Sequence, residues 1–157
     1  MQKNHSNLEQ TIIHALSKPL SDPFVKECIV ILGEYQTVEA PHDGSISFFN
    51  AASDIALNFD AHDVLIKVEI SFSLSNKTAF SDLLQKYTNR HCIYQQLGKP
   101  TLVQKTLLAY DLSHYWMRFE LQEDITKKIV YLALSSIGKN YRRKEILLRT
   151  CKSSGKR

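Results

Sequence analysis

The chain has 157 residues, of which 43% are hydrophobic and 23% are charged, and its formal net charge is +4. This composition is typical of one globular domain and excludes disordered, collagen-like and low-complexity proteins. The apolar stretches are far shorter than the roughly 20 residues of a membrane-spanning helix, and the N-terminus lacks the apolar core of a signal peptide, so we expect a cytoplasmic protein.

Two short helices are predicted at the start of the chain. Ser6 and Glu9 have the spacing of a capping box, and the apolar residues that follow recur every fourth position, which predicts a helix that ends near Lys18. Asp22, followed by a proline, predicts the start of a second helix, and Gly33 predicts its end.

After Gly44 the hydrophobic period changes from that of a helix to that of a strand. Residues 45–50, 54–59 and 64–72 form three short runs separated by polar residues, and the last two runs alternate apolar with polar side chains. We expect these runs to pair as a three-strand antiparallel meander.

The middle of the chain returns to helical spacing. Residues 80–87 predict one short helix, and residues 89–97 predict a further turn or two that ends before Pro100. Three strand-like runs follow, at residues 102–110, 115–121 and 128–135. The last of these is apolar on both sides, so we expect it at the centre of a sheet. Residues 141–151 fit either a final strand or a final helix.

The predicted fold class is therefore α+β. N-terminal helices precede an antiparallel sheet, which is built from the three-strand meander and a second strand group separated by one or two helices. We expect residues 1–138 to form a single domain and residues 139–157 to form a basic, partly flexible C-terminal segment.

The charge is divided unevenly along the chain. Residues 139–157 hold eight basic residues and one acid, a net charge of +7, whereas the other 138 residues have a net charge of −3. Residues 34–69 hold seven acids and one base, a net charge of −6. Such asymmetry bears on the partners of a protein and not on its fold.

Motifs for catalysis or for a cofactor are absent from the sequence. It contains no glycine-rich phosphate loop, no C-x-x-C or H-E-x-x-H pattern and no G-x-S-x-G. Two His-Asp pairs, at 42–43 and 62–63, can be read as converging metal ligands or as ordinary polar turns, and we favour turns because such pairs are common by chance. The three cysteines lack the paired spacing of a disulfide framework or a zinc knuckle. We expect no enzymatic activity, no cofactor and no metal.

The acidic window predicts a negative surface that docks a basic protein, although acids in turns also serve solubility. Phe48 and Phe49 are adjacent, so in a strand one of them faces away from the core and can anchor a partner. Trp116 and Arg118 share a strand face, either as an interface hot spot or with Arg118 covering Trp116. The predicted partner-binding residues are Glu34, Glu39, Asp43, Phe49, Asp54, Asp60, Asp63, Glu69, Trp116 and Arg118.

The basic C-terminal segment predicts an alternative function, binding to nucleic acid. Its basic side chains would contact phosphates and its tyrosine would stack on a base, whereas the competing interpretation is a solvated extension. The residues concerned are Tyr141, Arg142, Arg143, Lys144 and Arg149.

The order of short motifs between residues 22 and 135 gives a family resemblance. A helix ending in Leu32-Gly33 is followed by a strand ending in Phe59-Asp60, a Leu97-Gly98-Lys99-Pro100 corner, a strand with Trp116 and a closing strand led by Ile129. This order resembles small bacterial immunity proteins of polymorphic-toxin and contact-dependent inhibition systems. The resemblance implies a non-enzymatic inhibitor that binds a cognate toxin domain, such as a nuclease, in the cytosol. Family members that face nucleases are often acidic overall, whereas the basic segment here reverses the sign.

Overall fold

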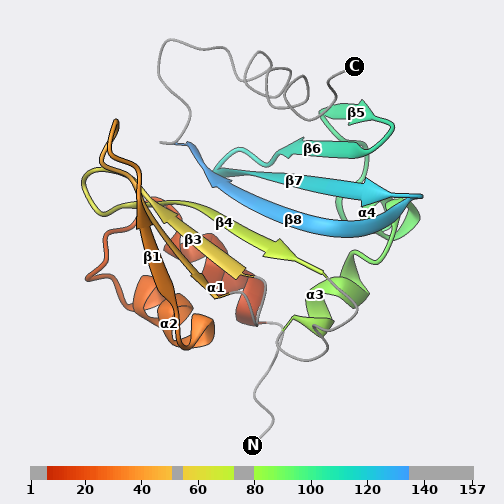
Figure 1. Cartoon of the computed structure of the whole chain (residues 1–157). Coiled ribbons are helices and arrows are strands. Elements are labelled where there is room, and N and C mark those ends of the chain that lie inside the picture. Colours follow the sequence, from red (N-terminus) through yellow and green to blue (C-terminus); the bar gives the residue numbers. More distant parts are fainter. Residues whose placement is uncertain (1–6, 51–54, 73–79, 135–157) are drawn as a thin grey trace, which may run out of the picture.

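The computed structural model of the chain describes residues 7–50, 55–72 and 80–134 (Figure 1). Within these ranges the fold is α+β, with four helices and one antiparallel sheet of eight strands. None of the helices in these ranges is long and apolar enough to cross a membrane. Asp54 and the basic segment at 139–157 lie outside the described residues.

The helices are α1 (Asn7–Ala15), α2 (Pro23–Leu32), α3 (Ser81–Lys86) and α4 (Arg90–Leu97). The strands are β1 (Gln36–Glu39), β2 (Ile46–Asn50), β3 (Ile55–Phe59), β4 (Leu65–Ser71), β5 (Leu102–Gln104), β6 (Leu107–Asp111), β7 (Tyr115–Gln122) and β8 (Ile125–Ala133). They lie in the order β1-β2-β3-β4-β8-β7-β6-β5, and each pair of neighbours is antiparallel. The predicted central position of the last strand is confirmed, because β8 lies between β4 and β7.

Side-chain and glycine caps explain where the helices begin and end. The Asp22 carboxylate accepts a hydrogen bond of 2.8 Å from the Phe24 amide at the start of α2, and Gly33 ends that helix with a φ of 74°. The Asn89 side chain caps α4 in the same way. The first helix ends at Ala15, earlier than predicted, because the chain turns there and the Ser17 amide bonds to β4.

The sheet differs from the predicted one at two places. The meander has four strands and not three, because β1 precedes it; all four residues of β1 are exposed, so no hydrophobic alternation marks them as a strand. The predicted single strand at 102–110 is the hairpin of β5 and β6, which turns at Lys105 and Thr106. Neither residue is a typical turn former, so the sequence reads as continuous there.

The sheet has an inner face, against which the four helices pack, and an outer face (Figure 1). Alternate residues of each central strand point inward, and Met117 and Phe119 of β7 lie in this main core. Trp116 points to the outer face, where it is 1% exposed and packs with Leu107 and Ala109 in a second apolar cluster.

Candidate partner-binding surface

Two acidic turns meet at one end of the sheet. Glu39 of β1 pairs with Ile46, and Ile46 pairs with Phe59, so the β1–β2 turn and the β3–β4 turn extend from the same end. A Cβ atom added at Gly44 would lie 3.2 Å from the Cβ atom of Ala61, which shows that the two turns are in contact. We call residues 39–45 and 60–63 the acidic end.

Hydrogen bonds within the turns fix the carboxylates of the acidic end. Asp43 accepts hydrogen bonds from the Ser45 amide at 2.9 Å and from the Ser45 hydroxyl at 2.7 Å, and these bonds lower the pKa of Asp43. Asp60 accepts hydrogen bonds from the amides of His62 and Val64 at 2.8 Å and 3.1 Å. Both side chains are therefore oriented before any partner binds.

The other predicted acids lie elsewhere. Glu34 is exposed in the loop before β1, at the far end of that strand from Glu39. Glu69 lies on the outer face, where its carboxylate is 3.6 Å from the ammonium of Lys67. The structure thus brings Glu39, Asp43, Asp60 and Asp63 together, and it keeps Glu34 and Glu69 apart from them.

The surrounding charge is strongly negative. No lysine or arginine lies between Lys26 and Lys67 in the sequence. Residues 7–50 and 55–72 hold nine acids and three lysines, a net charge of −6, whereas residues 80–134 hold five acids and seven bases, a net charge of +2. The first half of the described fold therefore attracts cations, and the second half does not.

The predicted aromatic and arginine residues share the outer face. Phe49, Glu69 and Arg118 lie in one row across the sheet, through Ala56 and Val130. Phe49 is half-buried, as expected for the phenylalanine that faces away from the core. The side chain of Arg118 is 13% exposed. Trp116, in the next row, is buried in the second apolar cluster, so in this structure it packs rather than offering an exposed anchor.

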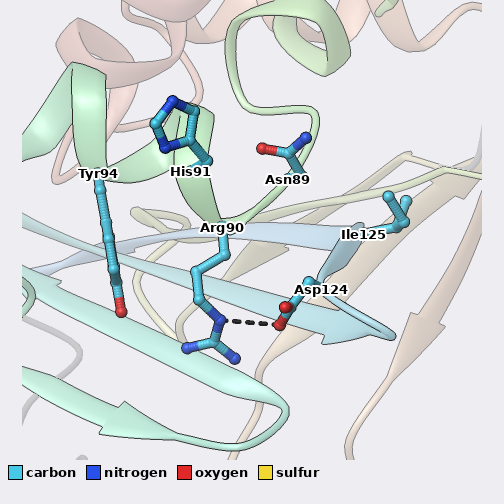
Figure 2. Close-up of a pocket in the computed structure, with 6 residues that line it drawn as sticks. All are labelled: Asn89, Arg90, His91, Tyr94, Asp124 and Ile125. Carbon is cyan, nitrogen blue, oxygen red and sulfur yellow. Dashed lines mark hydrogen bonds and ion pairs between the residues drawn. The ribbon is translucent and has the colours of Figure 1, made fainter.

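A hollow of about 460 Å³ lies elsewhere, between α4 and the β7–β8 turn (Figure 2). Arg90 is one of the residues that line this hollow. Its Nε donates a 2.9 Å hydrogen bond to Asp124, and its Nη2 donates a 2.7 Å hydrogen bond to the carbonyl of Lys105. Tyr94 and Asp124 raise the pKa of Arg90. The Arg90 guanidinium is thus occupied by Asp124 and by the Lys105 carbonyl. It holds the β7–β8 turn in place and is not an open site for an anion. The sequence does not predict this ion pair, because Arg90 and Asp124 are 34 positions apart in the chain.

A buried polar cluster joins α1 to the sheet. The Glu9 carboxylate accepts hydrogen bonds from the hydroxyls of Tyr87 at 2.8 Å and Tyr131 at 2.7 Å, and from the ammonium of Lys86 at 2.6 Å. Burial, and then the nearby Glu9, raise the pKa of Tyr131 well above its usual value, so this hydroxyl keeps its proton. Glu9 is 7% exposed, and its contacts hold α1 in place; Ser6, the other residue of the predicted capping box, lies outside the described residues.

Metal-ligand groups do not assemble in the described part of the chain. The two turns with His-Asp pairs touch, but no group of three or more histidine, cysteine, aspartate or glutamate side chains in the described ranges is arranged to hold a metal ion. Cys28 is buried, and burial raises the pKa of its thiol to about 12, so it packs as a protonated core residue.

Comparisons with known proteins add one distant similarity. No protein-family model and no curated protein matches the sequence. Among solved structures, the chain is similar to the crystal structure of a DUF4309 family protein (YjgB) from Bacillus subtilis subsp. subtilis strain 168, with a TM-score of 0.48 and 12% sequence identity. The similarity covers 82% of this chain and 95% of that chain.

Proposed function

We propose that this protein is an immunity protein, which binds a cognate toxin domain in the cytoplasm and neutralises it as a stoichiometric complex. The acidic end supports this proposal most directly. It places oriented carboxylates on two touching turns, and strands β1, β2 and β3 beside them carry no lysine or arginine. A toxin that acts on nucleic acid has a basic substrate-binding surface, and an acidic end complements such a surface.

Electrostatics of this kind chiefly speeds capture and selects the partner. Exposed charges accelerate association and suppress wrong partners, while buried apolar contacts supply most of the affinity. We expect an interface of roughly 1,600 Å² in total, centred on the acidic end and reaching the half-buried Phe49 on the outer face.

The alternative function, binding to nucleic acid, rests on residues 139–157, which lie outside the described residues. The described ranges carry fourteen acids and ten basic residues, a net charge of −4, so they would repel a polyanion. This balance favours a protein partner.

The test uses the toxin domain encoded next to this gene. We expect co-expression to restore growth and the two purified proteins to form a one-to-one complex. In the double variant E39K and D63K, which reverses the charge of two exposed acids of the acidic end, capture should weaken at least tenfold.

A matched control keeps the total charge change identical. The double variant D82K and E123K places the same two charge reversals on exposed positions of the other half of the fold, and it should bind normally. Equal losses in both variants would remove the acidic end as the binding site. Growth inhibition that co-expression does not relieve would refute the immunity function itself, and retention of the wild-type protein on DNA or RNA, lost on deleting residues 139–157, would support the alternative.

A further inference from the structure

Within the described ranges, the edge of the sheet at β1 is unpaired. Among these residues β1 pairs only with β2, and all four residues of β1 are exposed. Proteins usually block such edges with lysine or other charged residues, with proline, with a bulge or by keeping the edge strand very short, because unpaired main-chain groups invite another strand. β1 contains no lysine or proline, and its register with β2 is regular.

The main-chain groups that point outward can be assigned. The Ala40 amide donates a 2.8 Å hydrogen bond to the Ser45 carbonyl, so the main-chain groups of Ala40 face β2. In an antiparallel pair this orientation alternates along the strand. Thr37 and Glu39 therefore direct their N–H and C=O groups away from β2, and they offer two donors and two acceptors at the edge.

Apolar side chains lie on both faces of this edge. Val38 is 56% exposed and shares the outer face with Ser47, its partner on β2. Tyr35, just before β1, is 42% exposed and stacks on Phe48 of the inner face, with ring centroids 4.8 Å apart. An added strand would thus cover apolar surface on both of its faces.

The negative charge beside β1 favours a basic strand over an acidic one. Glu34 and Glu39 flank β1 at its two ends, and the nearest lysines in sequence are Lys26 and Lys67. Antiparallel pairing of two β1 strands would bring these glutamates of two copies together, which disfavours self-association here. A basic strand has the opposite charge and meets no such repulsion.

We propose that β1 is a docking edge, which takes an extended basic segment of the protein partner as a ninth strand of the sheet. The proposal rests on the proposed function, in that the partner is a protein, and it specifies how that partner is held. Main-chain hydrogen bonds to Thr37 and Glu39 provide the pairing, and alternating basic and apolar side chains provide the selectivity.

The first test uses a synthetic probe, an acetylated peptide of alternating lysine and valine. Binding should slow amide hydrogen exchange at Thr37 and Glu39 at least tenfold, with no comparable change at β5. The same peptide with every amide N-methylated has the same charge and no N–H to donate, so it should give no protection. Equal effects of the two peptides, or no protection at millimolar peptide, would overturn the proposal.

The second test removes one donor. In T37P the lost N–H points away from β2, so the sheet should retain its stability while peptide binding falls at least tenfold. T37V keeps the N–H and the branched shape, and it should bind as the wild type does. T37P that binds the peptide normally would overturn the proposal.

The cognate toxin domain distinguishes this proposal from the proposed function. Toxin capture that is weakened in the E39K and D63K variant but unchanged in T37P would refute the docking edge and leave the immunity function standing. Capture lost in T37P and retained in T37V would support both.

Discussion

The hydroxyl of Tyr131, on the central strand β8, donates a hydrogen bond of 2.7 Å to the carboxylate of Glu9, on the first helix. The two residues are 122 positions apart in the chain, so this contact forms only when both ends of the described fold have come together. The buried Glu9 carboxylate accepts hydrogen bonds from three donors. Removal of one donor leaves part of the free-energy cost of burying the charge uncompensated.

We therefore predict that Y131F lowers the free energy of unfolding by about 1.5–3 kcal/mol, the usual contribution of a hydrogen bond to a charged group. Y35F is the matched control: Tyr35 is exposed, so the removal of its hydroxyl should leave stability within about 0.5 kcal/mol. Urea denaturation of the three proteins measures the difference. Equal midpoints for Y131F and the wild type would show that Glu9 is satisfied without Tyr131.

Buried tyrosines also predict an alkaline loss of stability. Burial raises the pKa of Tyr110 from 10.0 to about 12. Below pH 10 the phenol stays protonated in both the folded and the unfolded chain; above it, the unfolded chain releases the proton and the folded chain keeps it. The free energy of unfolding should therefore fall as the pH rises from about 10 to about 12.

Chemical denaturation across this pH range checks the sign. Y110F removes one of the contributing groups, so its stability should fall less steeply than that of the wild type. It also loses the 2.9 Å hydrogen bond to the Gly98 carbonyl, which lowers stability by a constant amount at neutral pH. The slope with pH, and not the absolute stability, is the diagnostic quantity. Parallel curves for the two proteins would contradict the prediction.

Local signals in the sequence predict most of the elements. Asp22 and Asn89 mark helix starts, and alternation marks β3, β4, β7 and β8, because capping and burial depend on near neighbours. β1 escapes prediction because it buries no side chain, so its strand conformation comes entirely from pairing with β2.

The site is less predictable than the fold. Composition alone predicts that residues 34–69 form a negative surface, but it cannot show which acids meet. The turn of Asp43 touches the turn of Asp60 and Asp63, whereas Glu69 lies elsewhere; this follows from the register of the strands and from the proximity of Gly44 and Ala61. Glu9 fits a local capping box, yet its partners are distant tyrosines, which no local pattern reveals.

The β7–β8 turn holds two residues in an unfavourable conformation. Glu123 and Asp124 have φ values of 50° and 64°, as in a two-residue turn that favours Asn-Gly, and Arg90 anchors Asp124 (Figure 2). Among the described residues, no side chain anchors Glu123 in this way. We predict that E123G raises the free energy of unfolding by about 0.5–1 kcal/mol, because glycine adopts positive φ without strain.

The control for E123G is Q104G, at an exposed position of β5 that pairs in register with Leu107 and has no positive φ. There glycine only adds flexibility to the unfolded chain, so stability should fall by about 0.5–1 kcal/mol. Thermal or urea unfolding of both variants gives the opposite signs that we expect. A loss of stability in E123G would mean that the turn is not strained at this residue.

A substitution at Gly44 should affect both the stability of the fold and the geometry of the acidic end. Its φ of 73° disfavours any other residue, and an added Cβ would lie 3.2 Å from the Cβ of Ala61 on the other turn. Gly98 has a similar φ of 75° with no atom within 4 Å of an added Cβ. G98A therefore measures backbone strain alone, whereas G44A adds the collision, and we predict that G44A is destabilised by about 1 kcal/mol more.

A61G provides the rescue. In the double variant G44A and A61G the two Cβ atoms no longer meet, so the extra destabilisation should disappear while the backbone strain remains, a coupling that a double-mutant cycle measures directly. The same cycle reports on function, because turns that are pushed apart hold Asp43 and Asp63 in a different relative position. We expect toxin capture to weaken in G44A and to recover in the double variant. Additive effects on stability would show that the two turns are held together by something other than this contact.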